Sequence, residues 1–80
     1  MYIIIEMQTN NGQTALLPAA TYNNIFEAES AFYMKLASAA LSSIDVHTIL
    51  MFDEHGNVLK KDFYEHFTYE SVPNDVDIGM

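Results

Sequence analysis

The sequence has no cysteine and no arginine, and only three glycines and three lysines among its 80 residues. Without cysteine, the chain has neither a disulfide nor a cysteine-based zinc site to support a small core. The glycines, Gly12, Gly56 and Gly79, are scattered and predict no phosphate-binding loop. No segment reaches the length of a membrane span. The apolar start lacks a positively charged region and is interrupted at Glu6, so we expect a strand there, no signal peptide and a cytoplasmic protein.

Negative charge dominates the chain, because eleven acidic residues face three lysines and give a formal net charge of −8. Nucleic-acid binding requires several cations that neutralise phosphates, and arginine is the usual reader of guanine. Lys35, Lys60 and Lys61 are too few to form that surface. The composition therefore speaks against direct nucleic-acid binding, and the acidic surface instead suits solubility or a basic protein partner.

Half of the residues are hydrophobic, which is a large share for a small domain. A chain of 80 residues forms one domain. Such a chain buries only about 60–65% of the surface that its unfolded form exposes. Either the monomer packs unusually well, or part of the apolar surface is buried against a partner. Small domains often gain stability by oligomerising, so we favour the second explanation.

Runs of β-branched and aromatic residues, separated by turn residues, predict four strands and one helix. The expected elements are strands over residues 2–8, 13–18, 45–52 and 58–65, and a helix from about 25 to 41. Asn11 and Gly12 supply the positive φ angles that a tight hairpin requires. Asn24 and Glu27 have the spacing of a helix capping box, and Gly56 provides the second turn.

The order ββαββ predicts an α+β fold, with a four-stranded antiparallel sheet in the spatial order 2-1-3-4 and one helix on one face. Pro18 cannot donate a ladder hydrogen bond and marks one edge, and the adjacent Lys60 and Lys61 mark the other. Residues 1–66 form the predicted domain. Residues 67–80 are predicted to be an acidic, flexible C-terminal tail, or alternatively a segment that extends a partner's sheet.

A single helix covers only one face of such a sheet, so the opposite face needs another cover. Strand alternation gives one purely apolar side, which we expect under the helix: Ile3, Ile5, Met7, Val46, Leu50, Phe52, Leu59 and Phe63. The other side mixes large apolar groups with polar ones, including Glu6. We predict that this mixed side is a homodimer or docking interface, built on Tyr2, Ile4, His47, Ile49, Met51 and Tyr64. The alternative is that the tail, or the aromatic cluster of Phe63, Tyr64, Phe67 and Tyr69, folds back over it.

Few clusters of residues have the composition of a catalytic or metal site. Asp45 and His47 lie two residues apart on one strand face, as a polar pair or as half of a base or metal site. The turn of Asp53, Glu54 and His55 lacks the further acids of a calcium loop. No serine lies in a Gly-x-Ser-x-Gly elbow. The sequence therefore predicts no catalytic residue, no metal ligand and no cofactor, while an active site at a dimer seam stays open.

Three segments carry a resemblance: MYIIIEMQTNNGQTALLP, EAESAFYMKLASAALSS and VHTILMFDEHGNVLKKDFYEH. Together they resemble a group of short proteins that phages and prophages of gut Firmicutes encode, over residues 1–66. The group has no established activity, so the resemblance implies no functional residue. It implies a small accessory protein of a mobile element, located in the host cytoplasm or in the virion.

Two functions are consistent with these features. The first is a non-enzymatic protein-interaction module that forms homo-oligomers, such as a phage accessory or minor virion protein. The second is an acidic mimic of nucleic acid that inhibits a host defence protein by occupying its basic channel. The apolar second face and the lack of catalytic residues favour the first.

Overall fold

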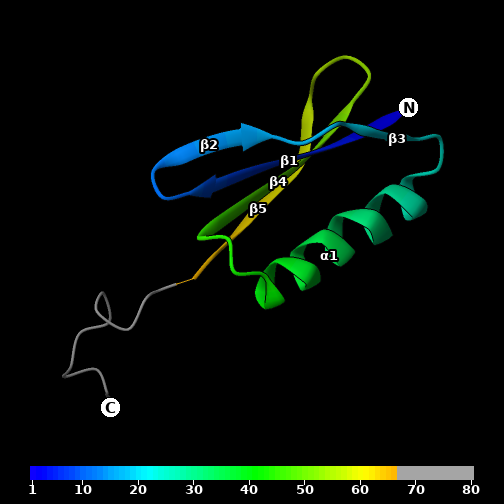
Figure 1. The fold of residues 1–80 in the computed structure, drawn as a ribbon. Helices are drawn as coiled ribbons and strands as arrows, with labels where there is room; N and C mark the ends of the chain where they lie inside the picture. Colours follow the sequence, from blue (N-terminus) through cyan, green and yellow to red (C-terminus); the bar gives the residue numbers. More distant parts are fainter. Residues whose placement is uncertain (67–80) are drawn as a thin grey trace, which may run out of the picture.

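The computed structural model describes residues 1–66, and the predicted C-terminal tail at 67–80 lies outside the described residues. The fold is α+β, with one helix packed on one face of an antiparallel sheet of five strands (Figure 1). The elements are β1 (Tyr2–Asn10), β2 (Gln13–Leu16), β3 (Ala20–Tyr22), α1 (Ile25–Leu41), β4 (Val46–Asp53) and β5 (Val58–Glu65). The coarse fold class predicted from the sequence is therefore confirmed.

The sheet differs from the predicted four-stranded arrangement by one strand. Its order is β2-β1-β4-β5, and β3 also pairs with β1. The long β1 pairs with β2 through Met7–Asn10 and with β3 through Tyr2–Ile4. Pro18 separates these two short strands, since proline has no N–H for the ladder. One edge of the sheet is thus divided between β2 and β3, and the predicted order 2-1-3-4 of four strands is corrected to this five-stranded arrangement.

The predicted turn and capping residues act locally as expected. Asn11 and Gly12 form the two-residue loop between β1 and β2, with φ angles of 54° and 79°. This is the positive-φ geometry that asparagine and glycine favour in hairpins. At the start of α1, Oδ1 of Asn24 accepts hydrogen bonds from the backbone N–H groups of Phe26 at 2.8 Å and Glu27 at 3.2 Å. These bonds satisfy donors that have no partner within the helix.

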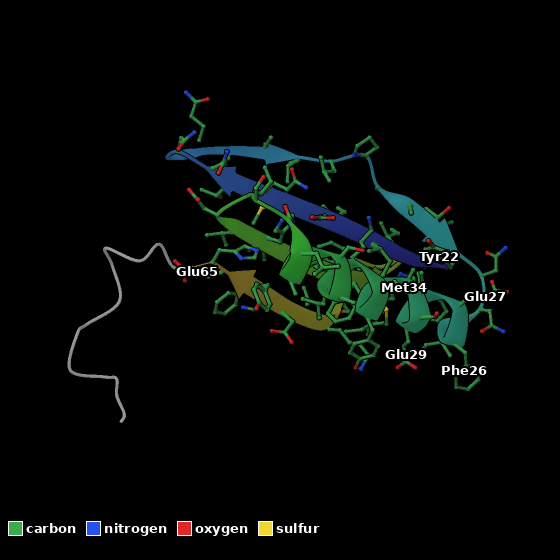
Figure 2. All side chains as sticks on the ribbon, turned by 60° about the horizontal axis from the view of Figure 1, so that its bottom comes forward. Tyr22, Phe26, Glu27, Glu29, Met34 and Glu65 are labelled. Atoms are coloured by element: carbon green, nitrogen blue, oxygen red, sulfur yellow. The ribbon has the colours of Figure 1, made fainter. Side chains whose placement is uncertain are left out.

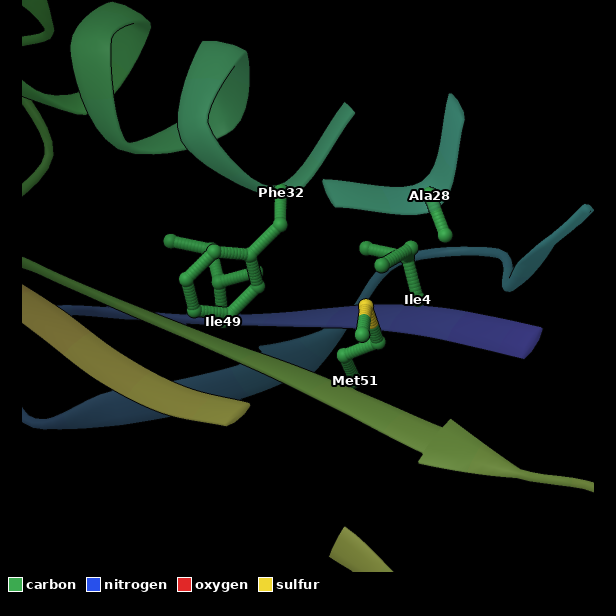
Figure 3. Close-up of a cluster of buried hydrophobic side chains, with 5 residues drawn as sticks. All are labelled: Ile4, Ala28, Phe32, Ile49 and Met51. Atoms are coloured by element: carbon green, nitrogen blue, oxygen red, sulfur yellow. The ribbon is translucent and has the colours of Figure 1, made fainter. Parts of the chain in front are cut away.

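The hydrophobic core lies between α1 and the middle of the sheet (Figure 3). Ala28 and Phe32 of the helix pack on Ile4 of β1 and on Ile49 and Met51 of β4, and all five are buried. Ala28, Phe32 and Ala39 are the buried residues of α1 and define its inward side. Alanine at the contact has no bulky side chain, so it allows the helix to lie close to the sheet.

The helix covers the opposite face of the sheet from the one that we expected. Ile4, Ile49 and Met51, which the sequence analysis assigned to an interface, are buried under α1. Because side chains alternate along a strand, Ile3 and Ile5 then point to the side without a helix. The predicted assignment of faces is therefore wrong. Its premise was that polar residues mark the uncovered face, and here the polar residues of the covered face are paired with one another.

Candidate functional site

A cluster of charged and polar side chains lies beneath the C-terminal half of α1. At its centre is the buried carboxylate of Glu6 on β1, which lies 2.5 Å from Nδ1 of the buried His47 on β4. Gln8 donates a hydrogen bond from Nε2 to the same carboxylate oxygen, at 3.2 Å. From the helix, Nζ of Lys35 approaches the other oxygen at 3.6 Å. The cluster therefore joins β1, β4 and α1 through one carboxylate.

These contacts also set the charge state of Glu6. Burial of the carboxyl group opposes its ionisation, but the hydrogen bonds from His47 and Gln8 and the positive charge of Lys35 outweigh that effect. The pKa of Glu6 is consequently below its usual value of 4.5. An ionised Glu6 at neutral pH explains how a carboxylate is tolerated beside the core, since buried charges require paired partners.

The arrangement does not present a catalytic base. His47 is only 4% exposed, and its Nε2 is buried without a hydrogen-bond partner within the described part of the chain. The other ring nitrogen is engaged by Glu6. A shallow pocket of about 270 Å³ lies above the cluster, and its lining includes Glu6, Lys35 and Ser38. A general base must reach the substrate proton directly or through one water, and the imidazole has no free nitrogen at a surface. We therefore interpret the cluster as a device that holds α1 on the sheet.

The other titratable residues considered in the sequence have local structural contacts. Asp45 does not pair with His47. Its Oδ2 accepts a hydrogen bond from the backbone N–H of Asn11 at 3.1 Å, which ties the β1–β2 turn to the start of β4. Asp53 accepts a side-chain hydrogen bond from Asn57, which, with backbone bonds from Asn57 and His55, lowers the pKa of Asp53. Within residues 1–66, no three His, Cys, Asp or Glu side chains are grouped as metal ligands would be.

Four of the six predicted interface residues are brought together under the helix. Ile4, Ile49, Met51 and His47 are buried, and Tyr2 packs at the edge of the core. Tyr64 is exposed and its ring lies 5.0 Å from that of His66. A residue that is enclosed by its own chain has no surface to offer to a second molecule. The interface prediction is therefore corrected at Ile4, His47, Ile49 and Met51, and it stays a prediction at Tyr2 and Tyr64.

The opposite side of the sheet, which we call the outer sheet face, is apolar and open. The strand pairings align its side chains in four rows across the sheet: Glu65, Val46, Thr9 and Thr14; Phe63, Thr48, Met7 and Leu16; Lys61, Leu50 and Ile5; and Val58, Phe52, Ile3 and Thr21. The central residues are half-buried by their neighbours, while Leu16, Val58 and Phe63 are exposed. Within residues 1–66, α1 packs only on the other side and no second helix exists to cover this face (Figure 1).

The centre of the outer sheet face, formed by Ile3, Ile5, Met7, Leu50 and Phe52, belongs to the purely apolar set that strand alternation defined. The signal that identifies it was therefore present in the sequence, and only the position of the helix was misassigned. Leu16 and Val58 were missed because the short β2 and the bulged start of β5 do not alternate clearly.

Comparison with protein-family models, with curated proteins and with solved structures gives no match to this chain. Among residues 1–66, no helix combines the length and the apolar character that crossing a bilayer requires.

Proposed function

We propose that this chain is a non-enzymatic protein-interaction module that self-associates through the outer sheet face. The observation that supports the proposal is the apolar centre of this face, whose charged strand residues, Lys61 and Glu65, both lie on the edge strand β5. An apolar surface that spans four strands is uncommon on a free monomer. The proposal keeps the interaction function inferred from the sequence and moves it to the other face of the sheet.

The size of this face sets the strength of the association. Strands spaced about 4.8 Å apart, with eight residues that each rise about 3.3 Å, give four strands a projected area of about 500 Å². Two copies placed face to face would bury about 1,000 Å², which is at the lower limit for a specific interface. Net negative charge on both copies opposes the approach. We therefore expect a dimer that dissociates on dilution and strengthens with added salt, because salt screens the repulsion.

A matched pair of substitutions in β5 tests the proposal. Phe63 and Tyr64 are adjacent aromatic residues, 59% and 41% exposed, whose side chains point to opposite faces of the sheet. We expect Phe63→Lys to place a charge in the outer sheet face and to shift the full-length protein toward the 9.1 kDa monomer. Tyr64→Lys adds the same charge on the helix side and should leave the mass unchanged. Size-exclusion chromatography with light scattering measures both.

Each outcome distinguishes self-association from its alternatives. A wild-type protein that stays at 9.1 kDa at all concentrations would contradict the proposal. So would a dimer that Tyr64→Lys breaks and Phe63→Lys does not, because that result would place the interface on the helix side. If residues of the same chain cover the outer sheet face, Phe63→Lys will lower the melting temperature of a monomer and leave its mass unchanged.

A further inference from the structure

The side of α1 that faces away from the sheet is also apolar. Phe26 is 75% exposed and Leu41 is 92% exposed, and Tyr33 and Met34 between them are more than half exposed. Their spacings place them on one side of the helix, together with the exposed Ser30 and Ala37. We call these six residues the outer helix stripe. Surface helices usually carry polar and charged residues on the side opposite the core, so this stripe is unusual for a helix that remains in water.

The surface shape of the outer helix stripe is suited to packing against a second helix. Large side chains at Phe26, at Tyr33 with Met34, and at Leu41 alternate with small ones at Ser30 and Ala37. Helices pack by inserting the side chains of one into the hollows between the side chains of the other. The 17 residues of α1 give a length of about 25 Å, which is enough for three to four turns of a partner helix.

The charges around the stripe indicate which charge a partner helix should carry. Glu27 and Glu29 lie on either side of Phe26 at the N-terminal end (Figure 2). At the other end, the last turn of α1 has no basic residue to offset the partial negative charge of the helix C-terminus. The single lysine of the helix, Lys35, points to Glu6, and Lys60 of β5 accompanies Glu29 at 3.6 Å. Lys60 also lies over the ring of Tyr33, 5.5 Å from its centre, and offsets the charge of Glu29. The uncompensated negative charge is therefore at Glu27 and at the C-terminal end of the stripe.

A second copy of the chain is a poor occupant for this surface. Packed parallel, two stripes would bring Glu27 and Glu29 of both copies together. Packed antiparallel, they would bring these carboxylates to the helix C-terminus of the other copy, which is itself partially negative. Neither arrangement supplies a cation beyond Lys60, which already accompanies Glu29 of its own chain, so complementarity requires a partner that carries lysine or arginine.

We propose that the outer helix stripe binds a basic amphipathic helix of another protein. The apolar side chains of that helix pack between Phe26, Met34 and Leu41, and its lysine or arginine residues lie beside Glu27, Glu29 and the end of α1. This assignment extends the proposed function by naming a partner. It does not depend on self-association, because the stripe and the outer sheet face lie on opposite sides of the domain.

The test uses a labelled leucine–lysine peptide of about 18 residues, a length at which an isolated helix is stable enough to populate. A leucine–glutamate peptide with the same leucine positions controls for charge. Fluorescence anisotropy with the full-length protein measures both affinities. We expect the basic peptide to bind at least about tenfold more tightly than the acidic one, and Phe26→Gln with Met34→Gln to weaken its binding by about tenfold or more. Glutamine retains helix propensity and changes no charge.

Leu16→Gln is the matched control, since Leu16 is an exposed apolar residue of the outer sheet face. It should leave peptide binding unchanged. Binding that survives in the Phe26→Gln, Met34→Gln protein would overturn the proposal, because charge alone would then hold the peptide. An equal loss of binding in Leu16→Gln would overturn it as well.

Circular dichroism checks that each variant is folded. If the double variant is not folded, Met34→Gln alone replaces it in the binding experiment. The double variant should still self-associate, whereas Phe63→Lys should bind the peptide but not a second copy.

Discussion

The contact between Glu6 and His47 gives a quantitative test of the structure. Replacing Glu6 with methionine removes the partner of His47 and leaves both ring nitrogens without a hydrogen bond from residues 1–66. Replacing His47 with leucine leaves the Glu6 carboxylate with only Gln8 and the partly exposed Lys35. Both substitutions approximately conserve side-chain volume, so the loss of polar contacts dominates their effect.

The sizes of these effects follow from the burial of the pair. Leaving a buried ionised group without its partner costs up to about 3–5 kcal/mol, because that group is then uncompensated. Water reaches Lys35, so we expect a smaller loss, about 2–3 kcal/mol, for each single substitution. The double variant replaces the pair with apolar side chains and should lie within about 1 kcal/mol of the wild type. The coupling energy in the double-mutant cycle then has a magnitude of about 3 kcal/mol or more.

Urea unfolding at pH 7, followed by circular dichroism at 222 nm, measures the four free energies of unfolding. If the two single losses add up in the double variant, the two side chains are independent and the reasoning is refuted.

The pH dependence of stability provides a second readout. The pKa of Glu6 is lowered in the folded state, so its contribution is complete above the usual value of 4.5 and is lost as the pH falls through the folded value. Below about pH 4.5 the wild type should therefore lose stability more steeply than Glu6→Met.

Three further substitutions test the core, the cap and the turn by the same urea unfolding. Phe32→Ala should cost about 3–5 kcal/mol by opening a cavity in the core, and loss of the folded helical signal at low urea is the expected readout. Asn24→Ala should cost about 1 kcal/mol, because the N–H groups of Phe26 and Glu27 lose their acceptor. Gly12→Ala should cost about 1–2 kcal/mol, because its φ angle of 79° is strained for a residue with a Cβ atom. An unchanged midpoint in any of the three would contradict the corresponding contact.

Local signals in the sequence were sufficient for most of the elements. The Asn11–Gly12 pair and the Asn24 cap each require a specific backbone geometry, so they located the first hairpin and the start of α1. The short strand β3 was missed because three residues after a proline have no measurable periodicity. Its existence depends on the free edge of β1, which is a tertiary property.

The covered face could not be read from polarity alone. The polar side chains of Glu6 and His47 suggested surface positions, but each offsets the cost of burying the other. Lys35 of α1 also contacts Glu6, and this contact exists only in the folded chain. Strand alternation correctly separated the two sets of side chains. It contains no information on which set the helix covers, and so the interface residues predicted from it were inverted.

The self-association of the outer sheet face is tested most directly by following isoleucine methyl groups in a dilution series. Ile3 and Ile5 lie on the outer sheet face, whereas Ile4 and Ile49 are buried beneath α1 and serve as internal controls. In NMR spectra of methyl-labelled protein, we expect the signals of Ile3 and Ile5 to shift with concentration while those of Ile4 and Ile49 remain fixed. Spectra that do not change at any concentration, or changes confined to Ile4 and Ile49, would contradict the proposal.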